Sequence, residues 1–246
     1  MSHPYRVLLN GNWKPGEILL IATAPGRRTI PEVERAIAEA WEKAAARPGV
    51  HLFDGPMSRL ERWSHSGPLL QLHVSPSNYK IFVGTNMANP RFADEYGPDV
   101  MANPIGMSTA LLTADGYLLL GRRNESLAYY PGWVHPFAGC LEPRDTDVFS
   151  AVERELGEEL SLEPAELNDL HCLGIIEDPA LRQPEMIFSA VTTRTKDEIA
   201  QRLDKLEHQS MVSILATVDE IEKAAAQTQI LTPAAIAAIS MWKAAR

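Results

Sequence analysis

The sequence predicts an α/β protein in two parts, a smaller α/β module before residue 105 and a larger one after it. Short runs in which apolar and polar residues alternate, such as 70–74, are typical of half-buried strands. Longer runs with helical spacing of apolar residues, such as 33–44 and 148–160, are interspersed with them. The chain changes character near residues 102–105, so we place the boundary between 1–104 and 105–246.

Length and composition narrow the class of protein. A chain of 246 residues can bury a substantial core and fits two modest domains, and 45% hydrophobic with 22% charged residues is ordinary globular composition. No window approaches a membrane span, and the first residues lack the apolar core of a secretory signal, so we expect a cytoplasmic protein without a membrane partner. The net charge of −9 argues against a nucleic-acid partner. Cys140 and Cys172 are too few for a disulfide framework.

In the first module, strands are expected at residues 5–9 and 17–23, joined by the turn-rich segment 11–16. A helix is expected over 33–44, because Pro31 suits a first helical turn and Pro48-Gly49 ends the pattern. A half-buried strand at 70–74 is then expected to pass through a turn at 75–78 into residues 79–83.

In the second module, residues 107–112 and 117–122 are expected to form a hairpin, and 148–160 a helix. Strands are expected at 173–176, 186–191 and 211–215. Three later helices have recognisable capping signals at their starts, which are Thr195 with Glu198, Thr217 with Glu220, and Thr232 before Pro233.

Three carboxylates crowd the expected helix 148–160. Glu155 lies one turn from both Glu158 and Glu159, so the three side chains share one side of the helix. Like charges at this spacing repel, and only Arg154 is near enough in sequence to offset them. A divalent cation would resolve the repulsion, and hard oxygen ligands suit Mg²⁺ or Mn²⁺. The alternative is an ordinary amphipathic surface helix with solvated glutamates.

The segment from Gly139 to residue 162 resembles the Nudix box, whose pattern is G, five residues, E, seven residues, then R-E-U-x-E-E-x-G-U with U aliphatic. The core Arg154-Glu155-Leu156-Gly157-Glu158-Glu159 matches it. The departures are Asp145 for the first Glu, a spacer of eight residues, Ser161 for a Gly, and Ala138 where another Gly is common. The resemblance implies an α/β/α sandwich with a mixed sheet over residues 105–246.

The resemblance also implies chemistry and roles. Glu155, Glu158, Glu159 and the Gly139 carbonyl would coordinate Mg²⁺, with Mn²⁺ as a possible substitute, and Arg154 would hold a glutamate in its binding rotamer. A water would attack phosphorus and cleave the phosphoanhydride of a nucleoside diphosphate derivative. The residue that deprotonates this water is left open between Glu155 and Glu185, which lies in a loop before a strand.

A second similarity concerns the substrate. Residues 79–86, from Tyr79 to Asn86, resemble a segment of the Nudix branch that hydrolyses UDP-glucose and UDP-galactose and carries an N-terminal extension of similar size. This makes a nucleotide sugar such as UDP-glucose the leading candidate, cleaved to a nucleoside monophosphate and a sugar phosphate. The candidate substrate-binding residues, each with a structural role as the alternative, are Arg122, Arg123, His135, Tyr79 and Asn86.

Other functions stay open at this point. ADP-ribose, dinucleoside polyphosphates and oxidised nucleotides are alternative small-molecule substrates, because the box specifies the chemistry and not the attached group. A non-catalytic nucleotide sensor would be expected to lose a box glutamate, and this chain keeps all three. An isoprenoid diphosphate isomerase would need a reactive thiol, for which Cys140 is the candidate. The number of ions and the oligomeric state have no signal in the sequence.

Overall fold

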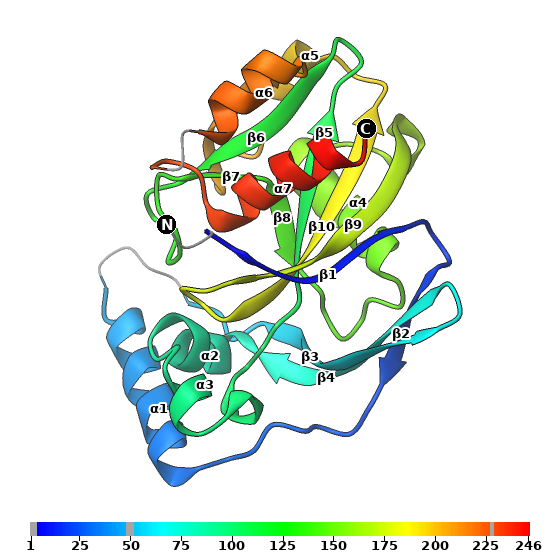
Figure 1. Cartoon of the computed structure of the whole chain (residues 1–246). Coiled ribbons are helices and arrows are strands. Elements are labelled where there is room, and N and C mark those ends of the chain that lie inside the picture. The colour runs from blue at the N-terminus through cyan, green and yellow to red at the C-terminus, as the bar shows by residue number, and fades with distance from the viewer. Residues whose placement is uncertain (1–3, 48–51, 227–228) are drawn as a thin grey trace.

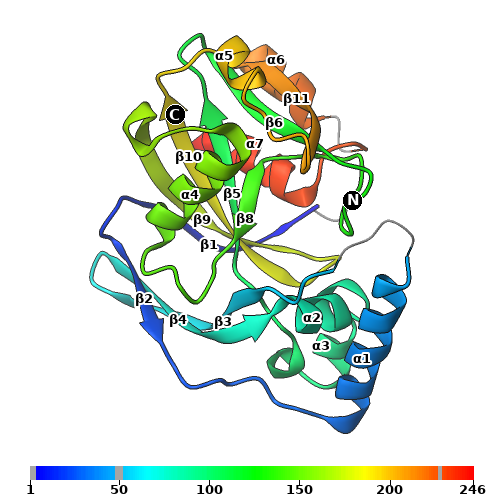
Figure 2. The ribbon, with the colours of Figure 1, turned by 180° about the vertical axis from the view of Figure 1, so that it is seen from behind.

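A computed structural model describes residues 4–47, 52–226 and 229–246. Its largest feature is an eight-stranded mixed sheet between two layers of helices, with a smaller three-stranded sheet and its helices at one end (Figures 1 and 2). The larger sheet has the strand order β1-β9-β10-β5-β6-β11, with β7 beside β6 and β8 beside β5. Strand β10 pairs in parallel with β5 and antiparallel with β9, so the predicted mixed sheet between helices is confirmed.

Most of the first hundred residues form the smaller unit. Its small sheet has the order β2-β4-β3, and α1 packs beside a π-helix named η1. The elements are β1 Arg6–Trp13, β2 Ile18–Ala22, α1 Pro31–Ala45, β3 Pro56–Ser66, β4 Leu69–Asn78, α2 Tyr79–Phe82, η1 Val83–Met87, α3 Phe92–Glu95 and the 3₁₀ turn η2 Pro98–Val100.

The remaining residues supply the other seven strands of the large sheet and the helices on its faces. Their bounds are β5 Gly106–Leu112, β6 Tyr117–Arg123, β7 Val134–His135, β8 Phe137–Cys140, α4 Val148–Leu160, the 3₁₀ turn η3 Pro164–Glu166, β9 Leu167–Asp178, β10 Gln183–Thr192, α5 Lys196–Ala200, β11 His208–Leu215, α6 Val218–Ala225 and α7 Pro233–Ala244.

Two hydrophobic cores lie on opposite faces of the large sheet. On one face Val152 and Leu156 of α4 pack against sheet residues such as Phe188. On the other face Ile239 and Trp242 of α7 pack, together with α6, against the same strands. Figures 1 and 2, seen from opposite sides, show α7 and α4 covering these two faces. The central strands β5 and β10 therefore bury both of their sides, as expected for the centre of an α/β/α sandwich.

Local signals located several elements correctly. The hairpin of β5 and β6, the helix α4 and the strands β9 to β11 are confirmed, as is the first turn of α1 at Pro31. Thr195 and Glu198 form the expected capping box, and Thr232 caps α7. At Thr217 the hydroxyl accepts from the Glu220 N–H, which is half of the expected box.

The predictions for the first module need three corrections. Residues 75–78 continue β4 instead of forming a turn. Strand β2 ends opposite Val74, so Pro76 pairs only with β3. The N–H that Pro76 lacks therefore costs no hydrogen bond between strands. Segment 11–16 is partly strand, since β1 continues through an irregularity to Trp13. Strand β3 was missed. The predicted helix end at Pro48-Gly49 lies outside the described residues.

Strand β1 comes from the first module but pairs with β9 at the edge of the large sheet. The two parts of the chain are therefore joined by a strand as well as by a linker, and the domain boundary near residue 105 stays a prediction. None of the helices in the described segments combines the length and apolar character that crossing a bilayer requires.

Candidate active site

The three box glutamates lie in the C-terminal half of α4, each in a different environment. The helix starts at Asp147, whose carboxylate accepts from the Ser150 N–H at 2.8 Å, and ends at Ser161 in the left-handed conformation with φ of 51°. The Glu159 residue is only 4% exposed, while the Glu155 side chain is 15% and the Glu158 side chain 59% exposed. The C-terminal end of a helix carries partial negative charge, so carboxylates here are unfavourable without a cation.

Arg154 neutralises part of this charge. Its Nη1 lies 2.8 Å from Glu155 Oε1 and 3.4 Å from Glu158 Oε2, and its Nη2 lies 3.3 Å from Asp145 Oδ2. Within the described segments it is the one basic side chain paired with these two glutamates. Arg154 therefore fixes the Glu155 rotamer between the helix and the loop that contains Asp145.

Strand β8 forms the floor beneath the glutamates. The Glu155 carboxyl group lies so close to the Gly139 Cα that a Cβ at this position would collide with it. One residue earlier, the Ala138 N–H donates to Glu159 Oε2 at 3.0 Å. A side chain at 139 would displace the Glu155 carboxyl group, so space, and not backbone torsion, favours glycine here.

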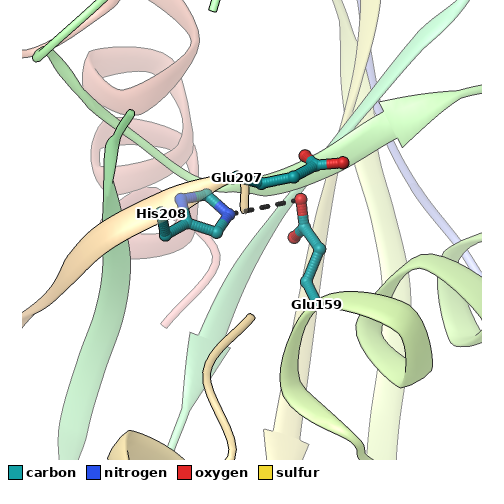
Figure 3. Close-up of side chains that lie close together, drawn as sticks. All are labelled: Glu159, Glu207 and His208. Atoms are coloured by element: carbon teal, nitrogen blue, oxygen red, sulfur yellow. Dashed lines mark ion pairs between the residues drawn. The ribbon is translucent and has the colours of Figure 1, made fainter. Parts of the chain in front are cut away.

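Two residues that the sequence reasoning missed complete this side of the site. Glu207 and His208 lie at the start of β11 and approach Glu159 at the end of α4 (Figure 3). One ligand atom from each of the three lies within 4.8 Å of the others. The pairing of His208 with Arg123 of β6 brings this segment to the site. The sequence signal that could have identified them is the pair Glu207-His208 just before the expected strand 211–215.

The electrostatics indicate a site that lacks positive charge. Burial, followed by the nearby Glu207 and Glu155 carboxylates, raises the pKa of Glu159 well above its ordinary value. Burial raises the pKa of Glu155 to about 7, with Glu158 adding to the effect and Arg154 opposing it. Burial lowers the pKa of His208 to about 4, so its 3.3 Å approach to Glu159 is not an ion pair at neutral pH.

This donor set fits a hard divalent cation. Glu155, Glu158 and Glu207 line the outer cavity beside Gly139, and Glu159 accepts from the Ala138 N–H of the same strand. Neighbouring carboxylates add to burial in raising the pKa of Glu155 and Glu159, and a bound cation would offset this repulsion. The alternative of solvated glutamates on a surface helix is wrong for Glu155 and Glu159, because both are largely buried. It describes only Glu158.

Two connected cavities adjoin the glutamates. The outer one has a volume of about 690 Å³ and is lined by Arg154, Glu155 and Glu158. The inner one has a volume of about 300 Å³ and is lined by Arg123, His135 and Glu185. Their shared lining residues are Met57, Tyr79, Leu127, Ala128, Ala138, Gly139, Cys140 and Glu207.

The first module forms one wall of this space. Met57 at the start of β3, Tyr79 and Phe82 of α2 line the inner cavity opposite the large sheet. Their rings and side chains pack in a cluster with Tyr129 and Tyr130 from the loop after β6. The cavity therefore lies between the two parts of the chain.

Glu185 reaches the inner cavity from β10. It is 4% exposed, accepts from the Ser108 hydroxyl, and lies above Gly106, where a Cβ would meet its carboxyl group. Burial raises its pKa to about 7, although the Ser108 bond opposes this shift. A carboxyl group that gains and loses a proton near neutral pH has the range needed for general acid-base chemistry.

The two adjacent arginines at the end of β6 differ in position. Arg123 lines the inner cavity, with Nε donating to the Tyr129 carbonyl at 3.0 Å and the guanidinium carbon 4.8 Å from the Tyr129 ring centroid. Arg122 is outside the lining and donates to the Gly132 carbonyl at 2.8 Å. Neighbouring residues of a strand face opposite sides, which separates them.

The remaining candidate residues also differ in whether they line a cavity. His135 is buried in the cavity wall, its Nδ1 lies 2.8 Å from Thr232 Oγ1, and burial lowers its pKa well below the ordinary value. Tyr79 lines both cavities. Asn86 is fully buried away from the cavity lining, where it bonds to protein backbone. Most candidates thus line one or both of the two cavities, whereas Glu159, Arg122 and Asn86 lie outside both linings.

Comparisons with known proteins agree with this geometry. The NUDIX domain family matches residues 103–234. The uridine diphosphate glucose pyrophosphatase NUDT22 of Bos taurus is 30% identical over 187 residues, covering 63% of this chain and 64% of its own length. The Mus musculus protein of that name is 30% identical over 186 residues, covering 63% and 60%. The chain spans less than two thirds of the length of these curated relatives.

Among solved structures, a MutT protein from Methanosarcina mazei Go1 is 17% identical, with a TM-score of 0.45 over 58% of this chain and 94% of its own. DR0079 from Deinococcus radiodurans is 17% identical, with a TM-score of 0.44 over 58% of this chain and 83% of its own. From the family match over residues 103–234 and the box acids that surround the cavity, we conclude that this chain belongs to the NUDIX family.

Proposed function

We propose that this protein is a magnesium-dependent pyrophosphohydrolase of nucleoside diphosphate derivatives, with a nucleotide sugar such as UDP-glucose as its leading substrate. The observation that carries the proposal is a group of carboxylates beside strand β8: Glu155 lies against Gly139 and lines the outer cavity, and the buried Glu159 accepts from the neighbouring Ala138 N–H. The name of the NUDT22 relatives, uridine diphosphate glucose pyrophosphatase, supports a uridine diphosphate sugar. The products would be a nucleoside monophosphate and a sugar phosphate.

The residues that would hold Mg²⁺, or Mn²⁺ in its place, are Glu155, Glu158, Glu159, the Gly139 carbonyl and Glu207. When bound, the cation neutralises phosphate oxygens and lowers the pKa of a coordinated water. Arg154 holds Glu155 in place by its 2.8 Å contact, so the carboxylate does not have to be reorganised when substrate arrives.

Substrate orientation and proton transfer fall to the inner cavity. Among the described residues, the Arg123 side chain donates one hydrogen bond, from Nε to the Tyr129 carbonyl. Its other N–H groups are left to bind phosphate or sugar oxygens. Glu185 is the general base that we favour, because its pKa of about 7 allows it to accept a proton from the attacking water. Water adds across the phosphoanhydride bridge, and its oxygen stays on the attacked phosphorus. Glu155 is the alternative base.

A substrate panel tests the proposal. The protein with Mg²⁺ is incubated with UDP-glucose, UDP-galactose, ADP-ribose, a dinucleoside tetraphosphate and free nucleoside triphosphates, and products are identified by mass in heavy-oxygen water. We expect UDP-sugars to be cleaved to UMP and sugar phosphate, with one product carrying the heavy oxygen and no turnover in EDTA. Turnover confined to nucleoside triphosphates would overturn the substrate. Binding of all nucleotides without turnover would support a sensor instead.

A further inference from the structure

Asn86 connects the two parts of the chain. It lies in η1 of the first module and is fully buried. Its Nδ2 donates to the Leu181 carbonyl at 2.9 Å and lies 3.3 Å from the Arg182 carbonyl, both in the turn between β9 and β10. Figure 1 shows the hairpin of β9 and β10 reaching down to α2, next to η1. The partners are 95 and 96 residues away in sequence.

The orientation of this amide is determined by its partners. Two carbonyl oxygens require the NH₂ group on one side. On the other side, the Asn103 N–H donates to Oδ1 at 3.3 Å and the Thr85 hydroxyl lies 3.0 Å from it. An aspartate of the same shape would place oxygen against both turn carbonyls. Only the amide satisfies both sides.

The tethered turn leads directly to the inner cavity. The Arg182 and Leu181 N–H groups donate to the Asp178 carbonyl at 2.7 and 3.2 Å, and Tyr130 donates to Asp178 Oδ2 at 2.8 Å. Arg182 adopts a left-handed φ of 56°. The chain then enters β10, and Glu185 follows three residues after Arg182. Asn86 thus holds one side of this turn and Tyr130 the other.

We infer that Asn86 is a positioning residue that fixes the β9–β10 turn and thereby the approach of Glu185 to the substrate. The Leu181 and Arg182 carbonyls have no other hydrogen bond in the described part of the chain, so losing the Asn86 amide would leave both without a protein partner. The Asn86 amide therefore adds a contact from the first module to a turn that Asp178 and Tyr130 hold from within the second. The inference depends on the proposed function, because it needs Glu185 to act on the substrate.

The test uses Asn86→Ala and Asn86→Asp, with Asn89→Ala as the matched control. The Asn89 Nδ2 donates only locally, to the Gly84 carbonyl at 2.8 Å, so its loss disturbs the same segment without touching the turn. With the nucleotide sugar that the wild type hydrolyses, we expect kcat of Asn86→Ala to fall roughly ten- to hundredfold through misplacement of a reacting group, with a smaller change in KM. Asn89→Ala should keep kcat within about twofold because it leaves that group in place.

A double mutant separates positioning from general stability. If Asn86 acts through Glu185, adding Asn86→Ala to Glu185→Gln should lower kcat no further, because a base that is absent cannot be misplaced. Equal cost of Asn86→Ala in both backgrounds would overturn the inference. Amide hydrogen exchange of the peptide spanning 178–185, without substrate, should be faster in Asn86→Ala than in wild type and in Asn89→Ala.

The outcomes distinguish the two proposals. A wild-type protein that cleaves no nucleotide sugar overturns the proposed function, and the catalytic role of Asn86 with it, whatever the exchange result. An active wild type with unchanged exchange and kcat in Asn86→Ala overturns only the inference. If Asn86→Asp does not fold, judged by circular dichroism, Asn86→Ala and the double mutant still decide.

Discussion

The two sides of the cavity differ in how they are assembled. The glutamate side is local in sequence, because one helix and the strand before it supply Glu155, Glu158, Glu159 and Gly139. The opposite side collects Tyr79, Arg123, His135 and Glu185, among others, from distant segments and from both parts of the chain. The comparison teaches that three of the acids proposed to bind the cation come from one helix, whereas Glu207, Glu185 and the residues proposed to bind the substrate meet only through tertiary packing.

The largest effect should come from the local side. Glu159→Gln removes a buried carboxylate, and we expect kcat/KM to fall on the order of a thousandfold because charge stabilisation is lost. Without metal, the variant should unfold at a higher temperature than wild type, since burial makes the ionised Glu159 unfavourable. Glu153→Gln, on the same helix but outside the group formed by Glu159, Glu207 and His208, is the control. Equal activity of both variants would contradict the assignment.

On the distant side, Glu185→Gln should lower kcat about a hundredfold, the usual contribution of a general base. In the wild type, kcat/KM should rise with pH through about 7, because the carboxyl group accepts a proton only when ionised. Steady-state rates from pH 5.5 to 8.5 check this. If the rate of Glu185→Gln still rises with pH through the same pKa, the general base would be Glu155 and not Glu185.

Folding stability should depend on pH through one glutamate on each side of the cavity. Glu155 and Glu185 have a pKa raised to about 7, while glutamate in an unfolded chain has about 4.3. The folded protein therefore binds more protons between these values, and without metal its stability falls as pH rises, by at most about 4 kcal/mol per group.

The measurement is thermal unfolding in EDTA and in Mg²⁺ at pH 5 and pH 8. We expect the midpoint in EDTA to be lower at pH 8, and Mg²⁺ to raise it more at pH 8 than at pH 5, because the cation binds the ionised carboxylates. An equal Mg²⁺ effect at both values would argue against a carboxylate site.

The smallest effect should come from the arginine pair. Arg123→Lys replaces the planar guanidinium, whose paired N–H donors reach the cavity, with a single ammonium group. We expect KM for UDP-glucose to rise roughly tenfold with less change in kcat. Arg122→Lys, which alters the adjacent side chain outside the cavity lining, should leave KM within about twofold because no bidentate site is lost there. A reversed order would mean that substrate enters from the other face of β6.

The sequence predicted the elements whose signals are local. Helix α4 follows from apolar spacing, and the starts of α5 and α7 from capping residues within three positions. It failed at β3, and at 75–78, where Pro76 indicated a turn but belongs to a strand paired on one side. Glu207 was missed because it approaches Glu159 only through the pairing of β11 with β6.

The sequence by itself thus indicated the family, the helix with its three acids and the proposal of a cation, because carboxylates at helical spacing repel one another whatever the rest of the chain does. Only the tertiary structure decided that Arg123 and not Arg122 faces the cavity, and that Asn86 holds a turn 95 residues away instead of lining that cavity. Strand register and the packing of distant segments set these contacts, and neither has a local signature.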